Sequence, residues 1–236
     1  MNVKTAILLC LSTAAVPAFA NTIALWTFEV NTPADLSDSA TISGVAADVG
    51  SGIASGSHLS ALSDWTTPAG NGSQNSLNAN YWAMNDYFQF RVSTFGYDSI
   101  SICWDQASSN TGPGTFGLFY SIDGGLFTQF GSDYSVLANA SPNPTWNSST
   151  ASSNYGFTAD FSSLGAMNNA ASVVFRLVDA NSTSANGGTV GSTGTDRVDN
   201  FKVTGSKVPV SLPTGFGAMV LAGVVLCSRR FVRGIA

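Results

Sequence analysis

The sequence predicts an all-β fold, an antiparallel β-sandwich of the jelly-roll kind that spans residues 21–207. Two observations lead to this prediction. Apolar residues in several segments recur at every second position, which is the period of a half-buried strand. Segments rich in Gly, Ser, Asn and Pro separate these strands, as in sandwiches and jelly rolls. The apolar period of the region is two rather than the 3.6 of a helix.

The strands are expected in order along the chain, beginning with Ile23–Phe28. Alternating apolar residues then mark Phe88, Phe90 and Val92; Ile100, Ile102 and Trp104; Phe116, Leu118 and Tyr120; the segment Leu126–Phe130; Val173, Phe175 and Leu177; and, at the end, Val198, Phe201 and Val203. Loops are expected at 67–79, 108–114, 139–154 and 181–195.

Two shorter features fall between these strands. Asp123-Gly124-Gly125 lies between two strand segments and is typical of a hairpin turn. The segment Ser162–Ala170 is the one place where a helical turn is expected.

The predicted domain is acidic. Residues 21–207 carry 14 acidic and five basic side chains, which leaves a net charge of −9. Nucleic-acid binding needs Lys and Arg against the phosphates, so this composition excludes it. Cys103 is the only cysteine of the region, so no disulfide bond can form within it. We expect Cys103 to be a buried strand residue, and the alternative is a reactive thiol.

The first 20 residues have the pattern of a secretory signal peptide. Lys4 provides the positive start, an apolar run follows, and Pro17 ends it. Ala18 and Ala20 form a small-x-small cleavage site before Asn21. The alternative is a buried N-terminal helix.

Residues 208–236 have the pattern of a membrane anchor. Val208 to Cys227 is a stretch of 20 residues without charge, followed by Arg229, Arg230 and Arg233. At about 1.5 Å per residue, such a helix spans the hydrocarbon core of about 30 Å. The arginines favour the cytoplasm, so residues 21–207 are expected outside the membrane. The alternative is a C-terminal strand or helix of the core.

The order of these tail motifs resembles the PEP-CTERM sorting signal of bacterial extracellular proteins. The resemblance rests on Val208-Pro209, then Leu212-Pro213, then the span with Arg229-Arg230 behind it. No Glu follows Val208-Pro209, so the tail is closer to the variants with Val-Pro-Leu-Pro-Ala character. The resemblance implies an exosortase, a membrane transpeptidase-like enzyme, as partner, and an envelope or extracellular matrix rich in polysaccharide as destination.

The region between the two ends also resembles the jelly-roll modules that such tails carry. The resemblance runs from Trp26-Thr27-Phe28-Glu29 through Asp86-Tyr87-Phe88-Gln89-Phe90 to Arg197-Val198-Asp199-Asn200. Carbohydrate-binding jelly rolls with a similar beginning and end imply a shared structural Ca²⁺ at Glu29 and Asp199, with Asn200 completing the ligands. Hard oxygen ligands suit this ion. The alternatives are an ion pair of either acid with Arg197 or Lys202, and solvated strand ends.

Several aromatic residues in or beside loops are candidates for stacking on sugar rings. They are Trp65, Trp82, Tyr87 and Trp146, with Tyr81 nearby. Flat rings pack against the apolar faces of sugars, and the polar residues around them can bind hydroxyl groups. The alternative is that these rings cap the ends of the sandwich.

No catalytic residue is expected. The chain has one histidine, His58, and one glutamate, and it lacks a Gly-x-Ser-x-Gly motif. We therefore expect an exported, non-enzymatic surface or matrix protein associated with exopolysaccharide. The alternatives are a carbohydrate-binding module and, behind both, a hydrolase.

Overall fold

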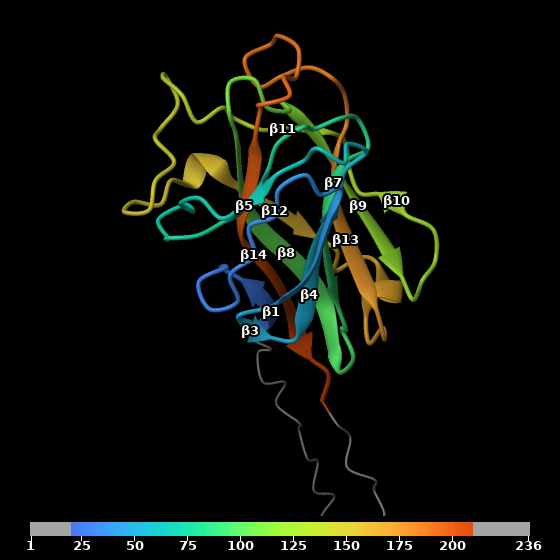
Figure 1. Cartoon of the computed structure of the whole chain (residues 1–236). Helices are drawn as coiled ribbons and strands as arrows, with labels where there is room; N and C mark the ends of the chain where they lie inside the picture. Colours follow the sequence, from blue (N-terminus) through green and yellow to red (C-terminus); the bar gives the residue numbers. More distant parts are fainter. Residues whose placement is uncertain (1–19, 210–236) are drawn as a thin grey trace, which may run out of the picture.

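The computed structural model describes residues 20–209 as two antiparallel β-sheets packed face to face (Figure 1). This confirms the predicted all-β sandwich. Sheet A has the order β12 (Gly156–Asp160), β8 (Tyr97–Ser108), β14 (Asp196–Lys207), β1 (Asn21–Trp26), β3 (Val49–Gly50), with β6 (Leu77–Ala79) beside β14 and β5 (Trp65–Thr66) beside β6. Sheet B has the order β10 (Thr128–Gln129), β9 (Thr115–Ile122), β13 (Val173–Asp179), β7 (Tyr87–Val92), β4 (Gly52–Ser57), β2 (Thr41–Ala46), with β11 (Tyr134–Ser135) beside β9.

The core lies between the sheets and is rich in aromatic rings. The predicted inward residues of β7, β8 and β13 are all buried. Across the middle, the rings of Phe90 and Phe201 stack at 3.7 Å, and Trp26 meets Phe90 edge-on at 5.2 Å. Phe90 belongs to sheet B and the other two to sheet A, so these contacts join the layers. Such ring pairs add about 0.5–1.5 kcal/mol each beyond their burial.

Strands β2 and β4 lie in segments where the sequence predicts no strand. Their sequences, TISGVA and GIASGS, lack the alternating large residues of the predicted strands. The structure explains the small residues of β4. A Cβ atom on Gly52 would lie 2.7 Å from the Trp26 ring, and one on Gly56 would overlap the Trp65 ring. These glycines make room for two core tryptophans. Strand β6 is a further strand that the sequence does not predict, since it occupies the end of the expected 67–79 loop.

The last strand contains a bulge that the sequence pattern reflects. Its buried apolar residues are separated by three positions, from Val198 to Phe201, instead of two. The register against β8 shifts between Asp199 and Lys202, and Asn200 has a φ of 51°. The bulge therefore brings both Val198 and Asp199 into buried positions.

The two predicted short features are present. Asp123 and Gly124 both have positive φ, 49° and 79°, and the Gly125 N–H donates to the Ile122 carbonyl at 2.9 Å. This is the type I′ geometry of a two-residue hairpin. A 3₁₀ turn, η2 (Gly165–Met167), lies within the predicted helical segment, and a second, η1 (Ser153–Tyr155), precedes β12.

Cys103 is not buried as predicted. It is half-exposed on the outer face of β8 and is a free thiol. Its neighbours Ile102 and Trp104 take the inward positions of that strand, so period-two alternation turns Cys103 outward. Burial still raises the pKa of its thiol.

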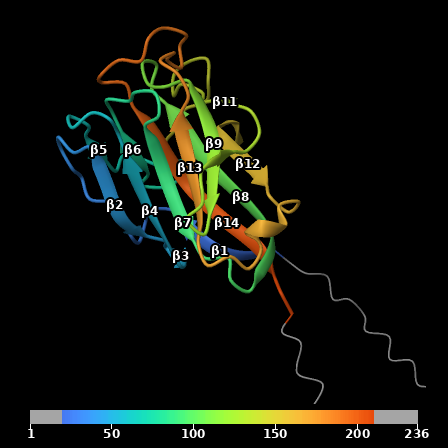
Figure 2. The same ribbon diagram turned by 90° about the vertical axis from the view of Figure 1, so that its right-hand side faces the viewer.

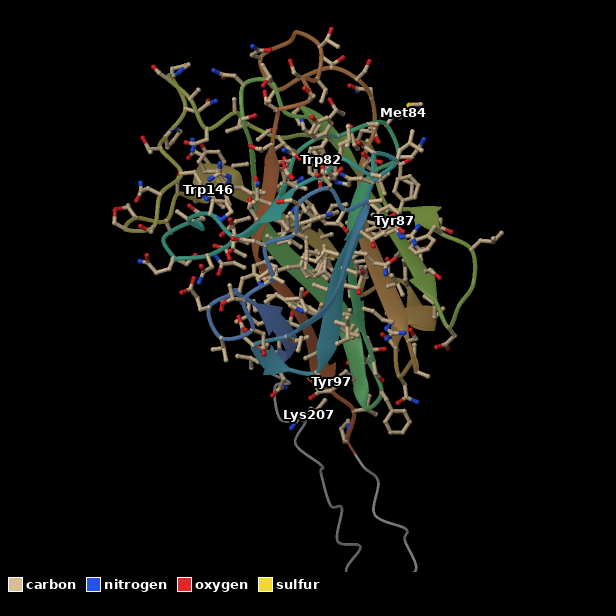
Figure 3. The ribbon with its side chains drawn as sticks, viewed as in Figure 1. Trp82, Met84, Tyr87, Tyr97, Trp146 and Lys207 are labelled. Atoms are coloured by element: carbon tan, nitrogen blue, oxygen red, sulfur yellow. The ribbon has the colours of Figure 1, made fainter. Side chains whose placement is uncertain are left out.

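The two described ends of the chain lie close together. Strands β1 and β14 are antiparallel neighbours, and Asn21 pairs with Gly205 (Figure 1). Figure 3 shows Lys207 and Tyr97 at this same end of the sandwich. The predicted signal peptide, apart from Ala20, and the tail beyond Pro209 lie outside the described residues. Within residues 20–209, no helix has the length and apolar character needed to cross a membrane.

Candidate ligand-binding face

The outer face of sheet B carries a row of side chains joined across its strands. Register places Ser55 of β4 beside Gln89 of β7, and Gln89 beside Arg176 of β13. The Arg176 Nε donates to Gln89 Oε1 at 2.8 Å, and Gln89 Nε2 donates to Ser55 Oγ at 3.2 Å. Opposite residues of antiparallel strands have Cβ atoms about 4.5–5.5 Å apart, so these bonds follow directly from the register. In Figure 2 the strands β4, β7, β13 and β9 lie side by side toward the viewer.

Arg176 lies between two aromatic rings. Its Cζ is 3.9 Å from the centre of the Tyr87 ring and 3.8 Å from the centre of the Phe127 ring. Both rings are half-exposed. Cation–π contacts of this kind contribute about 0.5–1 kcal/mol each at exposed sites. Burial lowers the pKa of the guanidinium from its ordinary value of 12.5, and it stays charged at neutral pH. The guanidinium is therefore held between the faces of the two rings, and the three side chains form a stack with a positive centre.

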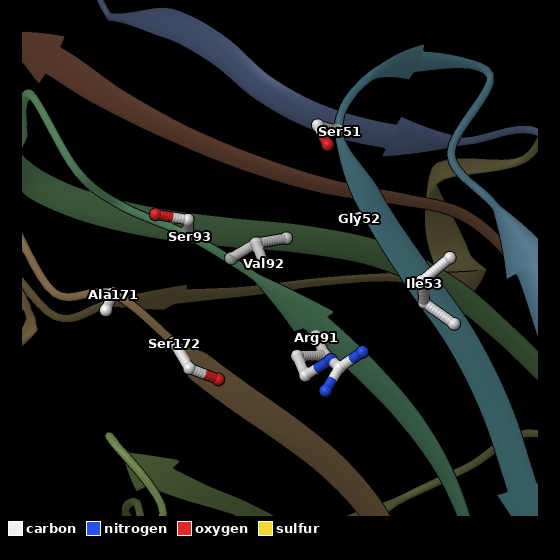
Figure 4. A pocket seen from close by; sticks show the side chains of 8 residues that line it. All are labelled: Ser51, Gly52, Ile53, Arg91, Val92, Ser93, Ala171 and Ser172. Carbon is white, nitrogen blue, oxygen red and sulfur yellow. The ribbon is translucent and has the colours of Figure 1, made fainter.

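Two hollows lie along strand β7 on this sheet. One, of about 350 Å³, is at the Tyr87 end and includes Ser57, Met84 and Asn85 in its lining. Figure 3 labels Tyr87 and Met84 at this end of the sheet. The other, of about 290 Å³, is at the other end of the strand and includes Arg91, with serine side chains around it (Figure 4). Tyr87, Gln89 and Arg91 alternate with buried residues, so they lie on one face. The face thus runs as a continuous strip between the two hollows.

The structure corrects the sugar-stacking prediction for the three tryptophans. Trp65, Trp82 and Trp146 are only 0%, 5% and 3% exposed, so protein atoms cover their rings. Each indole N–H is also engaged, by the carbonyls of Ser39, Ala79 and Ala69 respectively. Trp65 and Trp82 belong to the main hydrophobic core, and Trp146 belongs to a second, smaller cluster.

Tyr87 is the one predicted stacking candidate that lies on the outer face of sheet B, and Arg176 and Phe127 were missed. The available signal for Arg176 was its outward position between Phe175 and Leu177. Phe127 lies in the segment that returns from the Asp123 turn toward β10, where no periodicity marks its direction. Only the pairing of β7, β13 and β9 brings the three together.

Asp199 anchors a loop through its carboxylate. It is fully buried, and its Oδ2 accepts from the Asn71 N–H at 2.9 Å and the Ser73 hydroxyl at 2.6 Å. Its Oδ1 accepts from the Asn200 N–H at 2.7 Å. Burial raises the pKa of Asp199 to about 6, while the hydrogen bonds from Ser73 and Asn71 act in the opposite direction.

Glu29 holds the same loop from another side, since its Oε1 accepts from the Asn75 N–H at 2.7 Å. The carboxylates of Asp199 and Glu29 thus already accept hydrogen bonds from N–H and O–H groups of the protein. Among residues 20–209, no three His, Cys, Asp or Glu side chains are close enough together to bind one metal ion. A calcium ion at Glu29 and Asp199 would have to use carbonyl ligands and displace some of these donors, and the calcium site stays a prediction.

His58 lies in the core beside a serine and an aspartate. Its Nδ1 is 2.9 Å from Ser63 Oγ and 3.8 Å from an Asp86 carboxylate oxygen. A catalytic triad uses one ring nitrogen for the serine and the other for the carboxylate. Here the same nitrogen faces both, and Ser63 is fully buried. Burial lowers the pKa of His58 to about 4, so the ring is neutral at physiological pH. The group fits a structural role.

A further hollow, of about 570 Å³, lies on the outer face of sheet A. Its lining includes Asp105, Phe157, Asn200 and Lys202. The Asn200 amide donates to Asp105 Oδ2 at 2.8 Å, so these polar groups are engaged with each other. We take the outer face of sheet B as the candidate site because its aromatic rings flank an arginine that has no acidic partner there.

Comparison with known proteins gives structures of similar fold at low identity. No family model matches the chain, and no curated protein matches it. The CBM22-1–GH10 modules of Clostridium thermocellum xylanase 10B, solved with xylohexaose, are 13% identical with a TM-score of 0.43, over 82% of this chain and 30% of that one. The tandem CBM22 domains of Paenibacillus barcinonensis Xyn10C are 12% identical with a TM-score of 0.42, over 85% and 49%.

A family 11 carbohydrate-binding module from Clostridium thermocellum, in complex with a mixed-linked tetrasaccharide, is also similar. It is 13% identical with a TM-score of 0.35, over 80% of this chain and 100% of that one. The chain spans less than half the length of the xylanase 10B structure and of the tandem CBM22 structure, 30% and 49% respectively. These similarities concern the fold, and the function is argued from the residues of this chain.

Proposed function

We propose that this chain is an exported, non-enzymatic protein of the cell surface or extracellular matrix, and that it binds polysaccharide through the outer face of sheet B. The observation that carries the proposal is the half-exposed stack of Tyr87, Arg176 and Phe127. Its flat rings suit the apolar faces of sugars. Gln89 and Ser55, beside the stack, provide hydrogen-bonding groups for hydroxyls.

The position of the stack supports this function. A strip along β7 with a hollow at either end suits an extended chain of sugars better than a single small molecule, which binds in a closed pocket. The side chains of the strip are also held in place before any ligand arrives, by the bonds from Arg176 to Gln89 and from Gln89 to Ser55. Such preorganisation lowers the entropic cost of binding.

The two ends of the chain support the location. The signal-peptide pattern before Asn21 and the PEP-CTERM-like tail after Lys207 favour export, membrane retention and sorting by an exosortase-type enzyme. In this proposal the tail brings the domain to the polysaccharide, and the outer face of sheet B holds it there. The chain itself carries out no reaction.

Binding to polysaccharides tests the proposal. The purified full chain is run through native gels that contain xylan, mixed-linkage β-glucan, dextran or polygalacturonate. We expect retardation by at least one of them. Tyr87→Ala and Phe127→Ala should each weaken that binding about 5- to 30-fold, because each removes 1–2 kcal/mol of ring contact. Leu126→Ala is the matched control, since Leu126 adjoins Phe127 but is 93% exposed.

Two results would contradict the proposal. One is the absence of retardation by every polysaccharide. The other is binding that survives both aromatic substitutions but is lost in Lys202→Gln, which would place the site on sheet A.

A further inference from the structure

Two arginines lie next to each other on the outer face of sheet B. Strand pairing puts Arg91 of β7 opposite Val174 of β13, and Arg176 is two residues further along β13. The two arginines are therefore diagonal neighbours, about 7–8 Å apart at the backbone. Only five basic side chains occur in residues 21–207, against 14 acidic ones. Two of these five thus occupy adjacent positions of one face, although like charges repel there.

Neither arginine has an acidic partner. Among residues 20–209, the only pair that meets the distance for a salt bridge is His58 with Asp86. The pKa of Arg176 is lowered by burial, and the one charge effect on it comes from Tyr87. By contrast, Arg197 is influenced by the carboxylate of Asp196. On one face of an acidic domain, two arginines without a salt-bridge partner leave positive charge available to an external anion.

The hollow at Arg91 has the composition of an anion site. Its lining holds Arg91, the hydroxyl-bearing residues Ser51, Ser93 and Ser172, and no acidic residue. Figure 4 shows the Arg91 side chain on β7 with Ser172 across from it on the neighbouring chain segment. The Arg91 side chain is exposed, so its guanidinium is open to a ligand. Guanidinium groups bind carboxylate and sulfate through paired N–H donors.

We propose that the outer face of sheet B selects an anionic polysaccharide, with Arg91 and Arg176 binding the carboxylate or sulfate groups of successive sugars. This inference rests on the proposed function and specifies its ligand class. Tyr87 and Phe127 pack against the sugar rings, while the arginines supply the preference for charge. The net charge of −9 repels such a polymer elsewhere on the domain, so the arginine pair also sets where it lies.

Matched pairs of charged and neutral polymers test this inference. The purified full chain is titrated with polygalacturonate and with its fully methyl-esterified form, and with dextran sulfate and dextran. We expect the charged member of at least one pair to bind at least about tenfold more tightly. Preference within the first pair indicates a carboxylate ligand, and preference within the second a sulfate ligand.

Substitutions locate the preference. Arg91→Gln and Arg176→Gln should each weaken binding of the charged polymer about tenfold or more, as expected for a lost charge-assisted hydrogen bond. Lys202→Gln is the control, because it changes the net charge equally but lies on sheet A. Arg91 is exposed, so its variant keeps the fold even where Arg176→Gln alters it.

The outcomes separate this inference from the proposed function. Equal binding of charged and neutral polymers, or equal losses in Arg91→Gln and Lys202→Gln, overturns the anion preference. If binding of a neutral polymer is then still lost in Tyr87→Ala, polysaccharide binding stands without it. Absence of binding to all four polymers overturns the anion preference, and the proposed function falls with it only if xylan and mixed-linkage β-glucan also fail to bind.

Discussion

At the scale of single residues, two glycines of β4 determine how tryptophan packs in this core. Gly52 and Gly56 lie where any side chain would meet the rings of Trp26 and Trp65. Both tryptophans are fully buried, and each donates its indole N–H to a backbone carbonyl, Trp26 to that of Val45 and Trp65 to that of Ser39. The glycines thus let the large rings fill the space between the sheets without displacing a strand.

Gly56→Ala is therefore expected to lower the free energy of unfolding by about 1–3 kcal/mol, because the new methyl group overpacks the Trp65 ring. Gly165→Ala is the matched control, since no heavy atom lies within 4 Å of the added Cβ. Urea unfolding, followed by tryptophan fluorescence, measures both. Equal midpoints for the two variants would contradict the packing argument.

Asp179 is a second residue with a measurable effect. It is fully buried on β13, and its Oδ2 has no hydrogen-bond partner. Burial, with repulsion from Asp86 as a smaller cause, raises its pKa to about 7 from 3.8. The folded state therefore holds a proton that the unfolded chain releases near pH 3.8. The contribution of this protonated carboxyl to the stability of the fold is complete below pH 3.8, and it is lost as the pH rises through about 7. Asp199, with a pKa of about 6, acts in the same direction.

His58 acts in the opposite direction. Its pKa of about 4 in the folded state is below the ordinary 6.5, so its contribution is lost as the pH falls from 6.5 to 4. Above pH 6.5 the Asp179 effect remains. We expect the melting temperature to fall between pH 6 and pH 8.

Asp179→Asn should flatten this dependence and raise the melting temperature at pH 8 by about 2–4 °C, the shift that 1 kcal/mol produces in a domain of this size. Asp38→Asn, at an exposed position, should leave the wild-type profile unchanged. Calorimetry at pH 6, 7 and 8 checks this, and a wild-type profile in Asp179→Asn would show that another group is responsible.

At the scale of strands and loops, the bulge of β14 connects the end of the chain to the loop at residues 70–75. Asp199 pairs with the outward Asp105, and its carboxylate binds Asn71 and Ser73, while Glu29, shortly after the first strand, binds Asn75. Residues more than a hundred positions apart thus close one end of the sandwich.

The calcium hypothesis makes a prediction at this scale. If Glu29 and Asp199 share an ion, millimolar Ca²⁺ raises the melting temperature of the wild-type chain, because a ligand that binds only the folded state stabilises it. The same addition should leave Glu29→Gln unchanged. Scanning calorimetry with Ca²⁺ and with a chelator measures the shift, and equal wild-type values in both would end the hypothesis.

Strands could be predicted where large apolar residues alternate, and not where small residues serve the packing of others. Strands β7, β8 and β13 show a clear period of two, while β2 and β4 are hidden by Gly, Ser and Ala. The candidate site was predictable only through Tyr87. Trp65, Trp82 and Trp146 lie beside loops in the sequence, but their burial depends on strands distant along the chain. Arg176 and Phe127 meet Tyr87 only through sheet pairing.

At the scale of the whole molecule, the two ends of the chain can be tested together. The full chain has a mass of 24.4 kDa. We expect protein recovered from the cell envelope or the medium to begin at Asn21 and to end near Val208-Pro209. Intact-mass measurement reports both ends at once, and replacing Arg229, Arg230 and Arg233 by Gln should leave the first cut and block correct sorting. Recovery of the uncut 24.4 kDa chain alone would contradict processing.

The pairing of β1 with β14 also determines how the domain is oriented relative to an anchor at either terminus. An anchor at either terminus would be attached at the same end of the sandwich, and the long loop at residues 181–195 lies at the opposite end (Figure 1). Strand β7 runs between these two ends, with Arg91 nearer to the termini and Tyr87 nearer to the 181–195 loop. A glycan bound along β7 would therefore extend away from the anchored end, and an anchor at the termini would leave the outer face of sheet B accessible to the matrix.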